Sequence, residues 1–217
     1  MALSKVNFNS MNVTPSASKA IKFNSGNNGL ETGDIGGSLV LISEQTASSS
    51  SVISFTSGID STYKEYIFKL INIHPQTDNV TFHFNMSADG GSNYNVTKTT
   101  TFFEAYHKED GSDQYLAYAD SRDLAQSTAF QTLGQEGQQA DDADQNLCGL
   151  LHLFNPSSTT FVKHFTATTI ANSHNATYCW NSYIAGYGNT TSAVNAIQFK
   201  MSSGNIDAGT IKMYGVS

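Results

Sequence analysis

Serine and histidine are the residues of this 217-residue chain whose chemistry most readily suggests catalysis. A nucleophilic hydroxyl needs a base beside it and donors that stabilise the developing oxyanion. The chain has 27 Ser and 6 His but no GxSxG motif. With so many serines, some Ser–His contact is expected by chance, so such a contact would not be evidence for catalysis. We therefore expect a non-enzymatic protein without catalytic residues. A glycan hydrolase remains a hypothesis, ranked third after the two non-enzymatic functions given at the end of this section.

Metal-ligating residue types are present, but their spacing does not suit a metal site. The histidines form no HxH or HxxxH pair; they are His74, His83, His107, His152, His164 and His174. Hard oxygens gather in one acidic loop, at Asp141, Asp142, Asp144 and Asn146. Calcium prefers such ligands, but the EF-hand spacing with its glycine and terminal glutamate is missing. We predict a solvated acidic loop, with no metal and no cofactor.

Aromatic side chains could bind carbohydrate, because sugars stack on exposed rings. Four of them lie close together in sequence, at Tyr178, Trp180, Tyr183 and Tyr187. In a strand, Tyr178 and Trp180 share one face and Tyr183 lies on the other. The alternative is that Trp180, the one tryptophan, fills the core, and this is the favoured interpretation because a lone tryptophan is usually well buried.

Charge and apolar runs exclude two classes of partner. The net charge of -7 and the pI near 5.2 argue against binding nucleic acid through a basic surface. No apolar run has the length of a signal peptide or a membrane span, so we expect no membrane insertion and synthesis in the cytoplasm. Cys148 and Cys179 form no CxxC pair, and two buried thiols are expected, although a fold that brings them together would allow a disulfide.

Any such site would have to be positioned by strands, because the composition is that of an all-β protein. Charged residues make up only 13% of the chain, and 27 Ser, 22 Thr and 19 Asn take their place. These types are poor in helix interiors and good in turns and on sheet faces. About nine or ten short strands, with turn signals every dozen residues, predict an antiparallel β-sandwich that is jelly-roll-like.

Period-two alternation is clearest between Val80 and Met86. Val80, Phe82, Phe84 and Met86 alternate with His83 and Asn85, which predicts a half-buried strand with the apolar set inward. A turn at residues 89–92 suggests a hairpin with Tyr94–Val96. The final strand, residues 209–216, alternates in the same way and is expected to be paired in a sheet.

Two segments depart from the strand pattern. Residues 1–37 are rich in Asn, Ser and Gly, with sparse apolar anchors at Phe8, Ile21 and Phe23, and they predict an extended arm that docks on another subunit. Residues 38–217 form the predicted sandwich domain. Within it, residues 108–146 are a long acidic excursion with one short strand at 115–118 and a helical turn near Leu124.

The closing run AIQFKMSSGNIDAGTIKMYGV, residues 196–216, resembles the end of small virion proteins of tailed phages that infect marine bacteria. In that family an SSGN turn and a GTIK-x-YG strand also end the chain. Three further stretches are similar to the same group: residues 53–63, 87–94 and 153–159. These stretches are turn and strand sequences, and none is a catalytic signature.

The resemblance implies a structural virion protein, as a tail fibre, a tail-associated protein or a capsid decoration. It implies a homo-oligomer, with a trimer favoured, that contacts other virion proteins. A host surface glycan is a further candidate partner, which the aromatic residues suggest and the resemblance does not. A carbohydrate-binding β-sandwich module is the alternative from a different class, with its site in the aromatic region and the acidic excursion.

Overall fold

The computed structural model describes residues 13–14, 19–26, 28–33, 39–134, 139–172 and 177–217. The chain divides into a first unit that ends at Ser38 and a second unit from Leu39 to Val216. Phe8, one of the three predicted arm anchors, lies outside the described residues.

The first unit contains a hairpin, where the sequence predicted only an extended arm. Strand β1 (Ala20–Phe23) pairs antiparallel with β2 (Leu30–Gly33). On one face of the hairpin Ile21, Phe23 and Leu30 are 39%, 71% and 37% exposed. On the other face Lys22 and Glu31 form an ion pair at 3.4 Å. The hairpin is therefore amphipathic, with its apolar face open.

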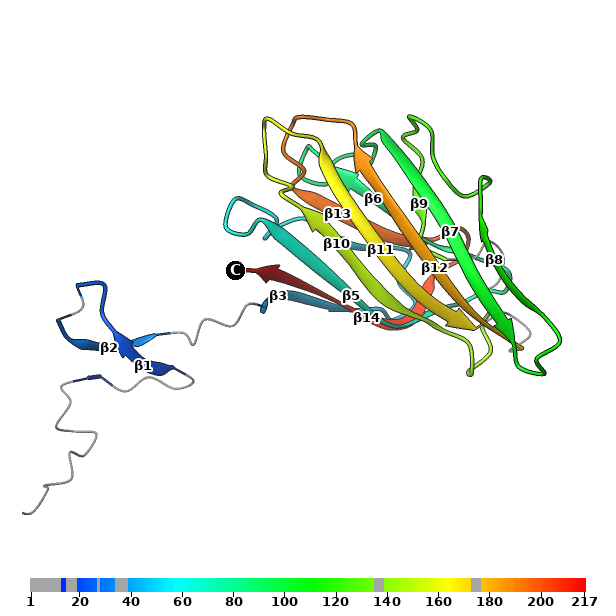
Figure 1. Ribbon diagram of the computed structural model, residues 1–217, viewed down its shortest axis with the longest axis horizontal. Helices are drawn as coiled ribbons and strands as arrows, with labels where there is room; N and C mark the ends of the chain where they lie inside the picture. Colours follow the sequence, from blue (N-terminus) through cyan, green and yellow to red (C-terminus); the bar gives the residue numbers. More distant parts are fainter. Residues whose placement is uncertain (1–12, 15–18, 27, 34–38, 135–138, 173–176) are drawn as a thin grey trace, which may run out of the picture. The chain divides into compact units, whose positions relative to one another are not determined.

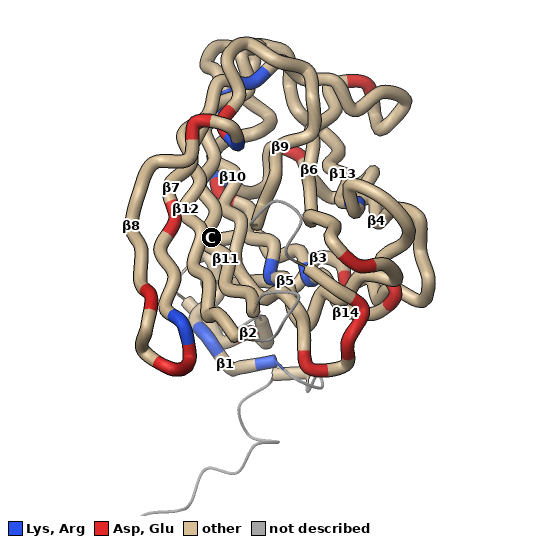
Figure 2. Tube along the Cα trace, turned by 90° about the vertical axis from the view of Figure 1, so that its right-hand side faces the viewer, with Lys and Arg blue, Asp and Glu red and all other residues tan. Residues whose placement is uncertain are grey.

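The second unit is an antiparallel sandwich, as predicted (Figure 1). Its eight-stranded sheet runs in the order β3 (Leu39–Thr46), β14 (Ile206–Val216), β5 (Glu65–Pro75), β10 (Leu147–Phe154), β11 (Lys163–Asn172), β12 (Tyr178–Gly188), β7 (Lys98–Lys108) and β8 (Gln114–Tyr118). Its four-stranded sheet runs in the order β4 (Ile53–Phe55), β13 (Ala196–Met201), β6 (Phe82–Ser87) and β9 (Gln131–Thr132). Figure 2 shows the two sheets as separate layers, with β7, β12 and β11 in one and β9, β6 and β13 in the other.

The all-β class is confirmed, and details of the topology differ from the expectation. A jelly roll has eight strands in two Greek keys, whereas this sandwich has more strands and divides them unequally between its sheets. The helical turn expected near Leu124 is wrong, because the described residues contain no helix. It follows that no helix of the described chain could cross a membrane.

The core lies between the sheets and is built from alternate residues of each strand. Phe82, Phe84 and Met86 of β6 are fully buried, which confirms the predicted register. Asn85 points away from this core as expected, yet it too is fully buried. Its Nδ2 donates to the carbonyl oxygens of Tyr94 at 2.7 Å and Thr128 at 3.0 Å. Loops cover this part of the sheet, and the Tyr94–Val96 segment contributes to the cover without forming a strand.

Two lysines are buried at one end of the eight-stranded sheet. Lys98 of β7 and Lys163 of β11 both pair in register with Gly188 of β12, and both are fully buried. Lys98 Nζ donates to Asn85 Oδ1 at 2.6 Å and to the Val96 carbonyl at 2.8 Å. A Cβ on Gly188 would lie 2.9 Å from Val96, so the glycine makes room for this packing.

The two cysteines are free, and the register keeps them apart. Cys148 pairs with Ile170 of β11, and Cys179 pairs with Asn172 of the same strand, so β11 lies between them. Cysteines two strands apart are beyond the Cα separation that a disulfide spans. The expectation of two buried thiols is wrong, because Cys179 is exposed on the sheet surface and Cys148 is only partly buried.

Candidate functional site

A polar cleft of about 370 Å³ lies beside β6 and β9, on the side of the four-stranded sheet that faces away from the core. Its floor includes Thr81, His83 and Thr132, and its wall is the loop of residues 119–130. The complete lining is Asn79, Thr81, His83, Ser121, Arg122, Asp123, Leu124, Phe130, Thr132 and Ser202. Most of these side chains carry a hydrogen-bond donor or acceptor.

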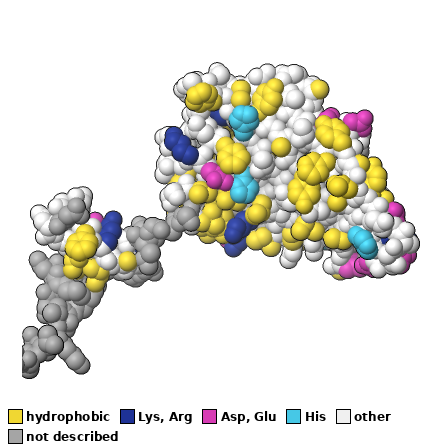
Figure 3. Space-filling model, viewed as in Figure 1, with side chains coloured by type: hydrophobic (Ala, Val, Ile, Leu, Met, Phe, Trp, Pro, Cys, Tyr) yellow, Lys and Arg dark blue, Asp and Glu magenta, His cyan; other side chains and the backbone are white. Residues whose placement is uncertain are grey.

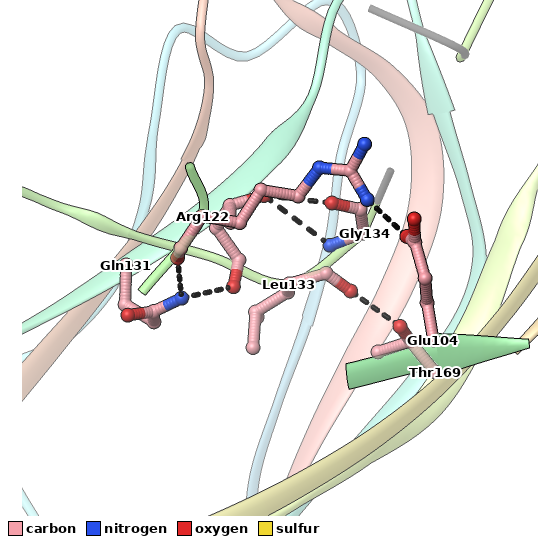
Figure 4. A network of polar contacts seen from close by, with 7 residues as sticks. Glu104, Arg122, Gln131, Leu133, Gly134 and Thr169 are labelled. Carbon is pink, nitrogen blue, oxygen red and sulfur yellow. Dashed lines mark hydrogen bonds and ion pairs between the residues drawn. The ribbon is translucent and has the colours of Figure 1, made fainter. Parts of the chain in front are cut away.

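A buried ion pair anchors the cleft wall to the eight-stranded sheet (Figure 4). Arg122 Nη1 donates to Glu104 Oε2 of β7, and both side chains are largely buried. The guanidinium also lies over the Phe102 ring, 5.6 Å from its centroid. Burial raises the pKa of the Glu104 carboxyl, and the neighbouring Arg122 opposes that change. The anchor therefore depends on both partners being present.

Further buried hydrogen bonds fix the same loop. Gln131 Nε2 donates to the Arg122 carbonyl at 3.0 Å, and Thr100 Oγ1 donates to Gln131 Oε1 at 2.7 Å. The Leu124 backbone N–H donates to Thr100 Oγ1 at 2.7 Å. Gln131 is fully buried, and Thr100 is 5% exposed. The wall is thus held by groups that are fully or almost fully buried.

The cleft contains balanced charge. Burial and the nearby Lys200 ammonium lower the pKa of His83 to about 4, so its imidazole is neutral at physiological pH. Asp123 accepts a hydrogen bond from the Tyr118 hydroxyl. Arg122 is paired with Glu104, but its Nε is buried and has no partner among the described residues. The cleft therefore offers donors and acceptors without a dominant net charge.

The four aromatic residues singled out in the sequence do not form one surface. Tyr178 and Trp180 lie on the inner side of β12, as alternation predicts, where the ring centroids of Trp180 and Tyr106 are 4.2 Å apart. Trp180 is 7% exposed and packs against Tyr106 and Tyr178. Tyr183 and Tyr187 lie on the opposite side.

Tyr183 and Tyr187 belong to the face of the eight-stranded sheet that is turned away from the four-stranded sheet, which we term the outer face. Tyr183 stacks on Phe103 with ring centroids 4.8 Å apart, and Tyr187 lies 6.1 Å from the His164 ring. Phe103 and Tyr183 are 42% and 36% exposed. The rings stand beside each other on neighbouring strands β7 and β12.

The outer face is uncharged over four neighbouring strands. The outward positions of β11, β12, β7 and β8 hold no Asp, Glu, Lys or Arg. Exposed apolar side chains there include Ile170, Leu116 and Tyr118, which are 52%, 72% and 53% exposed. Figure 3 shows apolar side chains spread over this part of the surface. This face could bury area against a partner without desolvating a charge.

The acidic loop does not form a metal site in the described part of the chain, where no group of three or more His, Cys, Asp or Glu side chains could hold an ion. Asp78 beside Asp141 raises the pKa of the Asp141 carboxyl. One of the histidines has a structural partner instead of a metal: His152 Nδ1 lies 2.5 Å from Glu65 Oε1.

Sequence reasoning missed the cleft. Its residues come from β6, β9, the end of β13 and the loop of residues 119–130, which are far apart along the chain. The one usable signal was the outward position of His83, read from its place between Phe82 and Phe84. Nothing local marks Arg122 or Asp123 as its neighbours.

Comparison with known proteins found one weak structural match and no sequence match. No family model matches the chain, and no curated protein matches it. A crystal structure of a protein of unknown function from Bacteroides ovatus aligns with 7% identity and a TM-score of 0.19. The alignment covers 65% of this chain and 46% of that chain, so this chain spans less than half the length of the protein it matches.

Proposed function

We propose that this protein is a non-enzymatic structural part of a tailed-phage particle, carried on the particle surface as a tail fibre, a tail-associated protein or a capsid decoration. The phage setting comes from the sequence resemblance of residues 196–216 and three further stretches. The observation that supports a structural role is the uncharged outer face over β11, β12, β7 and β8. Monomeric proteins seldom expose a large apolar patch unless it has a partner.

A second copy of the chain is the partner that suits this face. Four strands about 4.8 Å apart, with an average length of about 30 Å, present roughly 600 Å², somewhat less than the ~800 Å² per partner of a standard interface. The chain carries a net charge of -7, so two copies repel each other wherever the acidic residues of one face those of the other. The outer face brings copies together without that repulsion, and interface centres are depleted in charge in the same way.

The edge strand β8 supplies the complementary surface. It borders the eight-stranded sheet, and Leu116 and Tyr118 are its most exposed apolar side chains. An exposed apolar edge strand is a hazard unless something covers it. In the proposed trimer, the β8 edge of each subunit packs on the outer face of the next near Ile170, and a heterologous contact of this kind closes into a ring.

Light scattering on the purified full chain tests the assembly. We expect the mass of three chains for the unmodified protein, and a monomer for both Leu116→Asp and Ile170→Asp, because each buries a charge in the same contact. Val52→Asp is the matched control, since Val52 is 39% exposed but adjoins β4 in the other sheet. A monomeric unmodified chain, or a Val52 variant that also dissociates, would contradict the proposed interface.

Immunogold labelling of particles from the phage that encodes the chain tests the setting. We expect gold on the particle surface, with a tail or head pattern that separates a fibre from a decoration. Particles without label, alongside label in the lysate, would show that the chain is not a virion part.

A further inference from the structure

The cleft beside β6 and β9 holds polar groups that the fold does not use. Among the described residues, Arg122 Nε is buried without a hydrogen-bond partner, and the imidazole of His83 lines the cleft. A buried donor without a partner costs free energy, of the order of 1–3 kcal/mol. Because this nitrogen is closed to solvent, a ligand that enters the cleft would bond the accessible lining groups, such as His83 and Asp123, instead.

The charges around the cleft exclude strongly charged ligands. Lys200 of β13 and Arg122 would repel a cation, whereas Asp123 and the nearby Glu104 would repel an anion. His83 adds no charge above pH 5, because its pKa is about 4. It then presents one donor and one acceptor from the same ring.

The remaining lining combines hydroxyl and apolar groups. Ser121, Thr132 and Ser202 contribute hydroxyls, while Leu124 and Phe130 contribute an apolar side. This combination matches a sugar ring, which has an apolar C–H face and a rim of hydroxyls that both donate and accept. The volume of about 370 Å³ is at the small end of the range for ligand pockets.

We propose that this cleft binds a neutral sugar unit, at the end or a branch of a glycan. Asp123 and His83 bond its hydroxyls, and Leu124 lies against its C–H face. The site differs from the aromatic region of β12, and it goes beyond the proposed assembly, whose contacts are on the outer face.

The cleft is preorganised for this role. The Glu104–Arg122 pair and the buried Gln131 hold the wall from behind, so the binding groups lose little freedom when a ligand enters. Rigid support of this kind raises affinity without adding contacts.

A glycan array carrying neutral, sialylated and sulfated glycans, probed with the labelled full chain, gives the first test. We expect neutral glycans as the hits. A soluble monovalent form of the best hit is then titrated by calorimetry, so that avidity from a trimer does not enter the measurement. His83→Ala and Asp123→Ala should each weaken binding about tenfold, as expected for losing one or two hydrogen bonds.

Matched variants separate this site from the assembly surface. Ile170→Asp, on the outer face, should dissociate the trimer and leave the monovalent affinity unchanged. Ser121→Ala, on the exposed part of the loop, replaces Asp123→Ala if that variant melts early, and should weaken binding in the same direction. Affinity should be equal at pH 6 and pH 8, since His83 is neutral at both.

Three results would overturn the proposal. One is an array with no hit, followed by no heat with millimolar neutral oligosaccharide. Another is preference for sialylated or sulfated glycans. The third is a neutral hit whose affinity is unchanged in both His83→Ala and Asp123→Ala. Each of these leaves the trimer measurement standing, so failure of the sugar site and failure of the assembly are distinguishable.

Discussion

At the scale of single residues, Lys98 links burial to pH. Its ammonium bonds only an amide oxygen and a carbonyl, and burial lowers its pKa from 10.5 to about 7. In the unfolded chain the pKa returns to its ordinary value. Between these two values the unfolded state binds more protons than the folded state, so the contribution of Lys98 to stability rises with pH across that window.

Lys98→Met should remove this pH dependence. From about pH 7 to about pH 10 the free energy of unfolding of the unmodified protein should rise relative to the variant, by at most ~1.4 kcal/mol per pH unit. Urea denaturation at several pH values measures the difference, with Lys64→Met, an exposed lysine, as control. A difference that stays constant with pH would show that the Lys98 pKa is not depressed.

The Glu104–Arg122 pair gives a second residue-scale prediction. Arg122→Met leaves the Glu104 carboxyl buried without its cation, which should cost about 3–5 kcal/mol. Adding Glu104→Gln should restore part of that loss, because the uncompensated charge is removed as well. A double-mutant cycle by chemical denaturation measures the coupling. Strictly additive losses would mean that the two side chains do not interact in solution.

At the scale of elements, β6 separates core from surface. Phe84 packs edge-on against Phe165 with centroids 5.0 Å apart and is fully buried, whereas His83 points out toward the cleft. Phe84→Ala should therefore cost about 3–5 kcal/mol of unfolding free energy, and His83→Ala much less. Thermal and urea denaturation of the two variants compare them directly. Equal losses would place β6 in the opposite register.

Strands such as β6 could be predicted from the sequence because their information is local. The same local rule holds in β5, where the alternating residues Tyr66, Phe68 and Leu70 are buried and the strand ends at Pro75, which has no N–H to donate. Asn85 shows the limit: its side of β6 was found, but its burial depends on loops distant in sequence. The cleft could not be predicted for the same reason.

The first hairpin shows a different limit of local reasoning. β1 and β2 are four residues each, and their apolar side chains are sparse, so the sequence indicated coil. Pairing Phe23 with Leu30 and Lys22 with Glu31 is what organises the segment. These pairs become visible only when the register is known.

The last strand, β14, should be indispensable. It lies between β3 and β5, and Ile211 and Met213 are fully buried. Removing residues 210–217 would leave β3 without its partner and β5 paired on one side only, and would open the core, so the chain should not fold. Circular dichroism and the chemical-shift dispersion of an NMR spectrum show whether the shortened chain is folded. Removal of Ser217 alone is the control. A cooperative melting transition in the shortened chain would contradict it.

At the scale of the whole molecule, charged residues are distributed unevenly between the connections and the faces of the sheets. Acidic residues are concentrated in connections such as residues 108–113 and 141–144, whereas the outward positions of β11, β12, β7 and β8 hold none. The proposed assembly uses the uncharged face, and the proposed sugar site uses the opposite side of the sandwich. A surface subunit of a particle needs both: one face joined to its neighbours and one face open to the surroundings.

The first unit is expected to dock on another subunit or virion protein. A two-stranded hairpin is at best marginally stable alone in water, and the exposed Ile21 and Phe23 give this one an apolar face to bury. Removing residues 2–36 should leave a folded sandwich, since the second unit contains its own core, but the shortened chain should no longer join the particle.

Point variants of the full chain make the same test without a deletion. Phe23→Ser removes the most exposed ring of the apolar face, and Lys22→Ser, on the opposite face, is its matched control. Quantitative blotting of purified particles should show strongly reduced incorporation for Phe23→Ser and for the shortened chain, with Lys22→Ser near the unmodified level. Normal incorporation of the shortened chain would show that the hairpin is not the attachment, and its failure to fold would show that the two units are not independent. Reduced incorporation with an unchanged melting temperature would assign the apolar face of the hairpin to attachment, because the sandwich would then be intact.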